Sequence, residues 1–455
     1  MALDGVCREP VALLPASDYL KKLDTELAAI VEDAAHPLAS LSVLAMRGGK
    51  VVYHRQFGHR YIDNASAANN RPANADTMYR IASISKLITT LGAMRLVDEG
   101  KLSLDADVSE YLGFKLRNPN FPEDPITLRM LLTNTSSLLD DAGYYGDASR
   151  MAQFKDMLLP GGAKFGSGAM WAKIAKPGAY FQYANLPWGV VGTIMERVTG
   201  ERFDRLMRRL ILDTLSVKGG YHAADFSEQD LDNTATLYRK GVEVDDKMVW
   251  NPAGPWVPQT DNYRHEKPLP RAGPDYVVGT NGTLFGPWGN CRLTATGLGS
   301  VMLMLMNDGM HDGKKILSRQ SVNEMLSVQW KHDGKSRNGN SNGEAGYGDH
   351  LQAMNARGLG AQIFLDISGP GRGDRVVDGG GMNAVGHLGD AWGLTSAMLF
   401  DREKKNGMIF LIGGPGFNPE TNPGKYSSFF RHEELILTAL YRRAIANKPI
   451  DAAKQ

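Results

Sequence analysis

Long apolar segments are missing from this chain of 455 residues. Its longest apolar runs, such as residues 301–306 and 408–412, are far shorter than the roughly 20 residues with which a helix crosses a bilayer. Runs of like charge are also missing, and 51 basic residues nearly balance 50 acidic ones. The sequence therefore argues against stable membrane insertion, and against a nucleic acid or an anionic membrane surface as the main partner.

Cysteine is scarce, since only Cys7 and Cys291 are present. Two such residues either pair in an oxidising compartment or stay unpaired inside a core, so they leave the location of the protein open. The first 22 residues lack a basic segment followed by an apolar core, and no signal peptide is expected there. Two alternatives remain: a cytoplasmic protein with a native Met1, or an exported, periplasmic protein whose signal was replaced by a start codon.

Motifs for metal and phosphate chemistry are absent as well. The chain has neither a His-Glu-x-x-His pair nor a Gly-x4-Gly-Lys phosphate-binding loop. His54 and His59 are not spaced like two metal ligands on one helix face, and no helical pattern follows the glycines of residues 369–373. The sequence therefore predicts no metal and no organic cofactor, and it leaves the oligomeric state open.

An arrangement suited to acyl transfer lies in residues 78–100, where the apolar side chains follow helical spacing. These side chains belong to Ile84, Leu87, Ile88, Leu91 and Met94. We predict a helix with one buried face, closed by Gly100. Ser83 begins this helix, where unpartnered backbone N–H groups favour a developing negative charge, and Lys86 follows one turn later on the same face.

Ser83 and Lys86 form the chain's only Ser-x-x-Lys tetrapeptide. A serine hydroxyl becomes a good nucleophile when a base accepts its proton, and a desolvated lysine can be that base or can tune another one. The opposite interpretation is that the spacing arose by chance, because a chain of this size contains about one such tetrapeptide at random.

The order of the predicted elements indicates a sheet built from both ends of the chain, with a helical region inserted between them. Helices are predicted at residues 17–35, 126–132, 189–199, 203–212, 294–308 and 426–446, and strands at 41–46, 51–57, 359–365, 394–400 and 408–412. We expect residues 1–75 and 276–455 to form the sheet domain and 76–275 the helical domain. Residues 221–275 lack periodicity, which predicts a lid or pocket wall.

Two further segments carry groups that fit acyl transfer. Tyr183 is the only tyrosine with an asparagine, Asn185, two residues later. A nearby lysine ammonium favours the phenolate, so we expect the pKa of Tyr183 to fall far enough for base work, while Asn185 holds Lys86 and a substrate carbonyl. Residues 387–390, His-Leu-Gly-Asp, precede a predicted strand, and glycine there lets backbone N–H groups approach a reacting carbonyl. Taken singly, a buried tyrosine or a lone histidine is more often structural.

Together, Ser83-x-x-Lys86, Tyr183-x-Asn185 and His387-x-Gly389 occur in the order found in the serine β-lactamase and penicillin-recognising superfamily. The chain most resembles the class C β-lactamase-like branch and its family VIII esterases. The segments LLTNTSSLL and RLTATGLGSVMLMLMNDG extend this resemblance over most of the sequence. The resemblance implies an α+β fold of the β-lactamase and transpeptidase type, with an antiparallel sheet flanked by helices and an inserted all-helical region.

The resemblance also implies roles for the site residues. Ser83 would be the nucleophile, Lys86 and Tyr183 the acid/base pair, and Asn185 an orienting group. The backbone N–H groups of Ser83 and Asp390 would form the oxyanion hole, with Gly389 beside them.

Two departures from the family pattern bear on the substrate. His387 and Leu388 replace the Lys-Thr that meets a substrate carboxylate in lactamases and carboxypeptidases, and a histidine of ordinary pKa is mostly neutral at pH 7. Asn134 and Ser137 stand where histidine and glycine are frequent, which leaves the role of that loop open.

We interpret the chain as a serine hydrolase with a covalent acyl-enzyme that acts on a small-molecule ester or amide, with a carboxylesterase as the leading possibility. The alternatives within the superfamily are a β-lactamase, a D-amino-acid peptidase or amidase, and an acyltransferase. An arginine such as Arg357 or Arg375 beside His387 would weaken the ester preference. A non-catalytic acyl-binding sensor is the alternative of another class.

Overall fold

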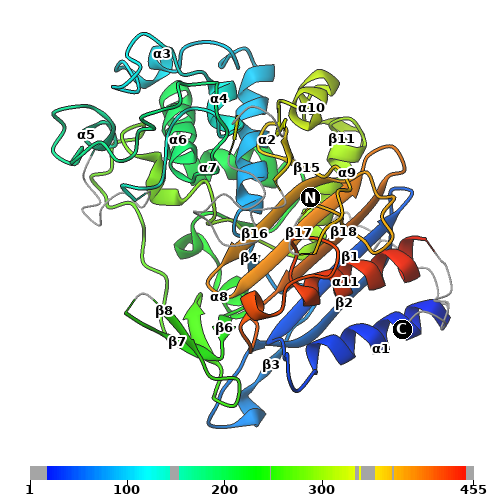
Figure 1. Cartoon of the computed structure of the whole chain (residues 1–455). Coiled ribbons are helices and arrows are strands. Elements are labelled where there is room, and N and C mark those ends of the chain that lie inside the picture. Colours follow the sequence, from blue (N-terminus) through cyan, green and yellow to red (C-terminus); the bar gives the residue numbers. More distant parts are fainter. Residues whose placement is uncertain are drawn as a thin grey trace, which may run out of the picture.

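An antiparallel sheet of nine strands forms the centre of the computed structural model, which describes residues 18–143, 153–245, 247–333, 338–339, 354–370 and 373–446 (Figure 1). The strand order is β13-β14-β15-β16-β17-β18-β1-β2-β3. In that order the bounds are Trp330–Lys331, Ala356–Arg357, Gln362–Ile363, Val385–Ala391, Leu394–Asp401, Asn406–Ile412, Ser40–Arg47, Lys50–Tyr61 and Arg71–Pro72. The predicted α+β fold is confirmed.

Segments from both ends of the chain meet inside this sheet. β1 pairs with β18, with Val43 opposite Phe410, and β1 also forms a hairpin with β2. Gly48 and Gly49 turn that hairpin with φ of 57° and 76°, the left-handed conformation that glycine adopts without strain. The prediction of a sheet built from both ends of the chain is therefore confirmed.

Helices cover both faces of the sheet and gather beyond one end of it (Figure 1). They are α1 (Asp18–Val31), α2 (Ile84–Asp98), α3 (Ser109–Leu112), α4 (Leu128–Leu132), α5 (Lys155–Leu158), α6 (Leu186–Thr199), α7 (Phe203–Met207), α8 (Glu228–Asp232), α9 (Ala295–Met306), α10 (Arg319–Leu326) and α11 (Arg431–Leu440). π-Helical turns Arg208–Leu212 and Tyr441–Ile445 follow α7 and α11, and 3₁₀ turns cover Ala67–Asn69, Ala223–Asp225, Gly282–Phe285 and Pro419–Thr421. In the described part of the chain, none of these helices has the length and hydropathy needed to cross a membrane.

The central strands are apolar throughout because their two faces enter two different cores. Val43 and Phe410 pack on the face covered by α1 and α11, which lie side by side in Figure 1. Their neighbours Leu44 and Leu411 point to the opposite face, where α2 and α9 pack. A strand with both faces buried is read from the sequence as a continuous apolar run, which explains why β1, β17 and β18 were predictable.

α2 differs from its prediction in one respect. The helix begins after Ser83 and closes at Gly100, whose φ is 69°, as expected. It is buried on all sides and not on one face, since its polar Thr89 and Thr90 are buried too. The sheet lies on one side of α2, and helices α6 and α7 lie on the other. The packing against α7 is close, because a Cβ atom at Gly92 would come within 2.4 Å of the Met207 sulfur.

The chain's last predicted helix, at residues 426–446, was wrong in its first turn. α11 begins at Arg431, because the N–H groups of Lys425, Tyr426 and Ser427 donate to the Glu434 carboxylate and not to carbonyls of a preceding turn. At the other end of the chain, α1 ends at Val31, earlier than the predicted residue 35. The helices expected at 126–132, 189–199, 203–212 and 294–308 are present as α4, α6, α7 with its π turn, and α9.

Strand β16 is the element that the sequence pattern missed. Residues 387–390 were placed before a strand, but they lie within β16 itself, paired with β17. Gly386, His387 and Gly389 interrupt the apolar pattern that marks the neighbouring strands. The strand predicted at 359–365 is shorter than expected, with only β15 there.

Residues 221–275 contain more regular structure than their sequence indicated. β6 (Leu237–Arg239) pairs with β9 (Val257–Thr260), and β7 (Gly241–Val244) pairs with β8 (Lys247–Trp250). This segment packs at the ends of the central strands, where the N–H of Tyr238 donates to the Gly413 carbonyl. Its function as a lid or wall stays a prediction, as do the domain boundaries.

Short strands complete the fold. β4 (Tyr79–Arg80), β10 (Arg292–Leu293) and β5 (Gly219–Gly220) form a three-stranded sheet, and β11 (Met310–His311) pairs with β12 (Lys314–Lys315). Cys291, just before β10, is buried and unpaired, whereas Cys7 lies outside the described residues, as does Ser17 at the start of the first predicted helix.

Candidate active site

Ser83 stands at the junction between β4 and α2. Ala82, immediately before it, has a φ of 44°, an uncommon left-handed conformation for a residue other than glycine. This bend turns the chain from the strand into the helix and leaves Ser83 at the N-terminal position of α2. The distance between the Ser83 Oγ and the Lys86 Nζ is 3.1 Å. The two side chains are therefore in contact, as predicted.

The Lys86 amine is completely enclosed. It donates to the Asn185 Oδ1 at 2.6 Å and to the Trp288 carbonyl at 3.2 Å, and its side chain is fully buried. Burial lowers the pKa of Lys86 well below its usual value, with the charge of Arg357 acting in the same direction and that of Asp140 opposing it. A neutral amine has two N–H bonds and one lone pair. With both bonds directed at carbonyl oxygens, the lone pair is left for the Ser83 proton.

Asp140 is a component of the site that no sequence motif indicated. Its carboxylate accepts from the backbone N–H groups of Asn185 and Leu186, at 2.8–2.9 Å, and from the Asn185 Nδ2 at 2.9 Å. It therefore fixes which way the Asn185 amide points, and so leaves the Oδ1 for Lys86. Burial raises the pKa of Asp140, while these N–H groups and the Lys86 charge oppose the rise. No signal in the sequence pointed to it, because Asp140 is 45 residues away from Asn185 in the chain and meets the N-terminus of α6 only in the folded structure.

The expected fall in the pKa of Tyr183 is wrong. Burial raises the pKa of this phenol to about 12, and the opposing effects of Ser83 and Arg357 are smaller. The ring lies 4.7 Å from the Lys86 Nζ, but a lysine that is itself desolvated offers little positive charge to stabilise a phenolate. Tyr183 is therefore suited to hold and pass on a proton, and Lys86 is the group suited to remove one from Ser83.

His387 is in the site but is fully buried, and its neighbour is an arginine. Its Nδ1 faces the Leu388 carbonyl at 2.5 Å and so carries the proton, which leaves the Nε2 to accept from the Arg357 Nη1 at 3.5 Å. Burial, and then the charges of Arg357 and Lys86, lower the pKa of His387 well below its usual value. His387 is therefore neutral, as expected for the family variant that lacks lysine here.

Arg357, on β14, is the cation that the sequence left undecided. Its guanidinium carbon lies 5.8 Å from the Tyr183 ring centre and 6.0 Å from that of Phe181. Burial lowers the pKa of Arg357 to about 10, so the group stays charged near neutral pH. Its Nε and Nη2 have no hydrogen-bond partner among the described residues. The other candidate, Arg375, pairs instead with Asp366 at 2.8 Å.

Gly389 brings strand β16 against the segment that leads into Ser83. A Cβ atom at this position would lie 2.6 Å from the Ile81 carbonyl oxygen and 2.4 Å from the Ser396 Oγ. Only glycine allows so close an approach. The next residue, Asp390, is exposed at the end of β16. The oxyanion hole expected from the N–H groups of Ser83 and Asp390 stays a prediction.

The loop at residues 133–137, whose role the sequence left open, holds the Tyr183 segment in place. The Asn134 Nδ2 donates to the Ala184 carbonyl at 2.8 Å, and the Gln182 N–H donates to the Asn134 carbonyl at 3.0 Å. Asn134 and Ser137 have φ of 58° and 64°. The left-handed conformation of Ser137 explains why glycine is frequent at this position in the segments that it resembles.

One group of side chains has the composition of a metal site. Asp204, His222 and Asp225 place one ligand atom each within 4.8 Å of one another. Arg202 already pairs with both carboxylates, with Asp204 at 2.6 Å and with Asp225 at 3.2 Å. The His222 Nε2 accepts from the Arg271 N–H at 3.1 Å, so the Nδ1 that faces Asp225 carries the proton. The arrangement fits an ion-pair network better than a metal site.

A family model described as Beta-lactamase matches residues 25–428. The chain is 30% identical over 165 residues to Penicillin-binding protein 4* of Bacillus subtilis (strain 168), covering 35% of this chain and 32% of that protein. It is 29% identical over 224 residues to Esterase EstB of Burkholderia gladioli, covering 46% of this chain and 53% of that protein. These matches thus span about a third and about half of the two relatives.

A solved structure shares the fold over nearly the whole chain. A penicillin-binding protein homologue from Caulobacter crescentus superimposes with a TM-score of 0.62 and 16% sequence identity, covering 95% of this chain and 99% of that chain.

Replacing Gly389 with alanine will damage the site through sterics. The new methyl group must displace the Ile81 carbonyl or the Ser396 side chain, so we expect a loss of about 1–3 kcal/mol in the free energy of unfolding and a fall of about 100-fold in the acylation rate constant. Urea unfolding and stopped-flow acylation measure the two effects. Gly273→Ala is the matched control, because nothing lies within 4 Å of its added Cβ. Equal stability and equal acylation rates of Gly389→Ala and Gly273→Ala would contradict the close contact between Gly389 and the Ile81 carbonyl.

The pH dependence of activity will move in opposite directions when Asp140 and Arg357 are changed. Only the neutral amine of Lys86 can accept the Ser83 proton, so kcat/KM falls below the pKa of Lys86. Asp140 raises this pKa and Arg357 lowers it. Asp140→Asn will therefore extend activity to lower pH, and Arg357→Met will restrict it to higher pH.

The measurement is the acid limb of the kcat/KM profile with an ester that does not ionise. Arg357→Lys, which keeps the charge, should stay close to the wild type. Because Asp140→Asn also loosens Asn185, we expect its maximal kcat to fall about tenfold or more. If the acid limbs of Asp140→Asn and Arg357→Met shift in the same direction, the assignment of Lys86 as the base is contradicted.

Proposed function

The chain belongs to the beta-lactamase family, and we propose that it is a serine hydrolase which forms a covalent acyl-enzyme on Ser83, with carboxylic esters as its preferred substrates. The observation that carries this proposal is the enclosed Lys86 amine, whose two carbonyl partners leave its lone pair for the Ser83 hydroxyl 3.1 Å away. This is the arrangement of an activated nucleophile and its base.

The first half of the reaction transfers the acyl group to the enzyme. The Ser83 Oγ attacks the ester carbonyl carbon while its proton moves to the Lys86 Nζ. The negative charge on the carbonyl oxygen is met by the N–H groups of Ser83 and Asp390. Collapse of this tetrahedral intermediate breaks the bond to the leaving group, and the proton passes from Lys86, by way of Tyr183, to the departing alkoxide, which leaves as an alcohol.

The second half returns the enzyme to its starting state. Water attacks the acyl carbon and gives one proton to Lys86, the ester bond to Ser83 breaks, and the Ser83 oxygen takes the proton back. The products are a carboxylic acid and free Ser83. Asp140 takes no part in these transfers. It keeps the Asn185 amide in the orientation that directs the Lys86 amine, and is therefore a positioning residue.

Two observations support esters over substrates that carry a carboxylate. His387 stands where lactamases and carboxypeptidases have lysine, and it is neutral and fully buried. Arg357 is charged but is also fully buried between aromatic rings, so a substrate carboxylate would have to displace side chains to reach it. One of the relatives described above also carries the name esterase.

A second candidate is a hydrolase of amides or β-lactams with a carboxylate, and Arg357 is the observation that favours it. The arginine lies beside His387, which is the placement that weakens the ester preference. Its Nε and Nη2 lack partners among the described residues, and a buried guanidinium of this kind gains from a carboxylate. A non-catalytic sensor, the third possibility, would form the acyl-enzyme and fail to release it.

The acyl-enzyme is tested by intact-mass spectrometry after brief exposure to p-nitrophenyl butyrate and, separately, to a cephalosporin. We expect an added butyryl mass on the wild type, rapid release of nitrophenol and little opening of the lactam. Ser83→Ala should carry no adduct and lose at least about 10⁴-fold in kcat. An adduct that persists without turnover would identify the sensor, and no adduct dependent on Ser83 would contradict the proposal.

The part played by Arg357 is tested with the same two substrates in Arg357→Met. If the arginine acts only on the pKa of Lys86, kcat/KM will fall by the same factor for the neutral ester and for the lactam with its carboxylate. A loss of about tenfold or more for the lactam alone would show that Arg357 binds the carboxylate. That outcome would replace the ester preference with the second candidate.

A further inference from the structure

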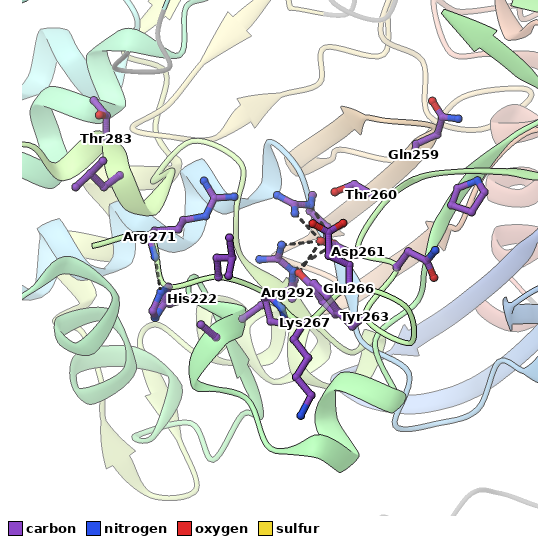
Figure 2. Close-up of a pocket in the computed structure, with 18 residues that line it drawn as sticks. His222, Gln259, Thr260, Asp261, Tyr263, Glu266, Lys267, Arg271, Thr283 and Arg292 are labelled. Atoms are coloured by element: carbon purple, nitrogen blue, oxygen red, sulfur yellow. Dashed lines mark hydrogen bonds and ion pairs between the residues drawn. The ribbon is translucent and has the colours of Figure 1, made fainter. Parts of the chain in front are cut away.

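A cavity of about 610 Å³ lies outside the catalytic group, next to the three-stranded sheet β4-β10-β5 (Figure 2). Arg80 and Arg292 form part of its lining, as does the segment from Pro258 to Arg271, whereas Ser83, Lys86, Tyr183 and His387 do not line it. Four cationic side chains and two carboxylates face this space.

The floor of the cavity is a buried group with an excess of positive charge. Asp261 accepts from Arg80 at 2.6 and 3.1 Å and from Arg292 at 2.7 and 3.2 Å, so one carboxylate serves two guanidinium groups. All three side chains are almost completely buried. Tyr263 also donates its O–H to Asp261, which adds no negative charge. The neighbouring arginines hold the pKa of Asp261 well below its usual range, against the effect of burial.

Arg271 adds a third guanidinium without a carboxylate of its own. Its side chain extends into the cavity toward Asp261 and Arg292 (Figure 2) and has no hydrogen bond or ion pair with any other described residue. Enclosure by protein, and then the charges of Arg80 and Arg292, lower the pKa of Arg271, while the opposing effect of Asp261 is smaller. The potential at Arg271 is thus positive, and the group remains accessible to solvent.

We propose that this cavity is an anion-binding site separate from the candidate active site, in which Arg271 binds the carboxylate or phosphate group of a small molecule. Guanidinium groups bind such oxyanions through paired N–H donors, and an anion here would supply the charge that Asp261 alone does not. Pro258, Leu269 and Leu284 give the cavity an apolar wall, which suits a ligand with a short hydrocarbon part.

The site is tested on the full chain with inorganic phosphate and with butyrate as probes. Isothermal titration calorimetry should show saturable binding to the wild type, weakened about tenfold or more in Arg271→Gln. The control is Lys101→Gln, because Lys101 is exposed, pairs with Glu99 at 2.9 Å and does not line the cavity. This control should bind as the wild type does. Binding is measured without substrate, so the result does not depend on the proposed hydrolase activity.

Thermal unfolding supplies a second measurement. A bound anion raises the melting temperature of the protein that binds it, so phosphate should stabilise the wild type and Lys101→Gln but not Arg271→Gln. Without anions, Arg271→Gln should melt no lower than the wild type, because it removes a cation that two others repel. Unfolding of this variant would contradict the finding that Arg271 has no structural partner.

The two probes distinguish a carboxylate ligand from a phosphorylated one, and two other results would contradict the proposed site. Binding of butyrate that requires Arg271 would identify a carboxylate such as the acid product of hydrolysis, whereas binding of phosphate alone would identify a phosphorylated molecule. An equal rise in melting temperature with sodium chloride at the same ionic strength would overturn the proposal, as would equal binding by the wild type and Arg271→Gln.

Discussion

Burial of one amine is the constraint on which the candidate active site depends. A lysine side chain can be enclosed only if it sheds its charge or meets compensating groups. Lys86 meets two carbonyl oxygens, from Asn185 and Trp288, which supply hydrogen bonds without a negative charge at contact distance. The enclosure of α2 by the sheet and by α6 and α7 keeps water away from this amine. The packing of α2 on the sheet, α6 and α7 thus also desolvates the Lys86 amine in its first turn.

Two nearby charges act on the pKa of this amine in opposite directions. Asp140 stabilises the charged form of Lys86 and Arg357 the neutral form. Neither touches the amine directly, and each is fixed by a different part of the fold: Asp140 by the N-terminus of α6, and Arg357 by β14 of the sheet. The proton affinity of Lys86 is thus set where the sheet and the helical region meet, which no single segment of sequence encodes.

The sequence predicted best what depends on short spacing. Ser83 and Lys86 are three residues apart on one helix, and Tyr183 and Asn185 lie on one turn, so local geometry brings each pair together. Strands β1, β17 and β18 were predicted equally well, because each is a short continuous apolar run. The contacts of Asp140 and Arg357 could not be predicted, because they join residues 45 and 30 positions apart in the sequence. The pKa of Tyr183 was misjudged for the same reason, since burial depends on the whole fold.

The candidate catalytic residues and the arginine cavity share supporting elements. Arg80 lies on β4, three residues before Ser83, and donates to the Asn290 side chain. Asn290 follows closely after Trp288, whose carbonyl holds the Lys86 amine. Arg80 also lies 4.8 Å from the ring of Trp392, in the turn that follows Asp390. The two ends of the candidate oxyanion hole and the partner of the base are thus joined to one buried guanidinium. Arg80 thus supports the proposed anion site and the candidate active site at once.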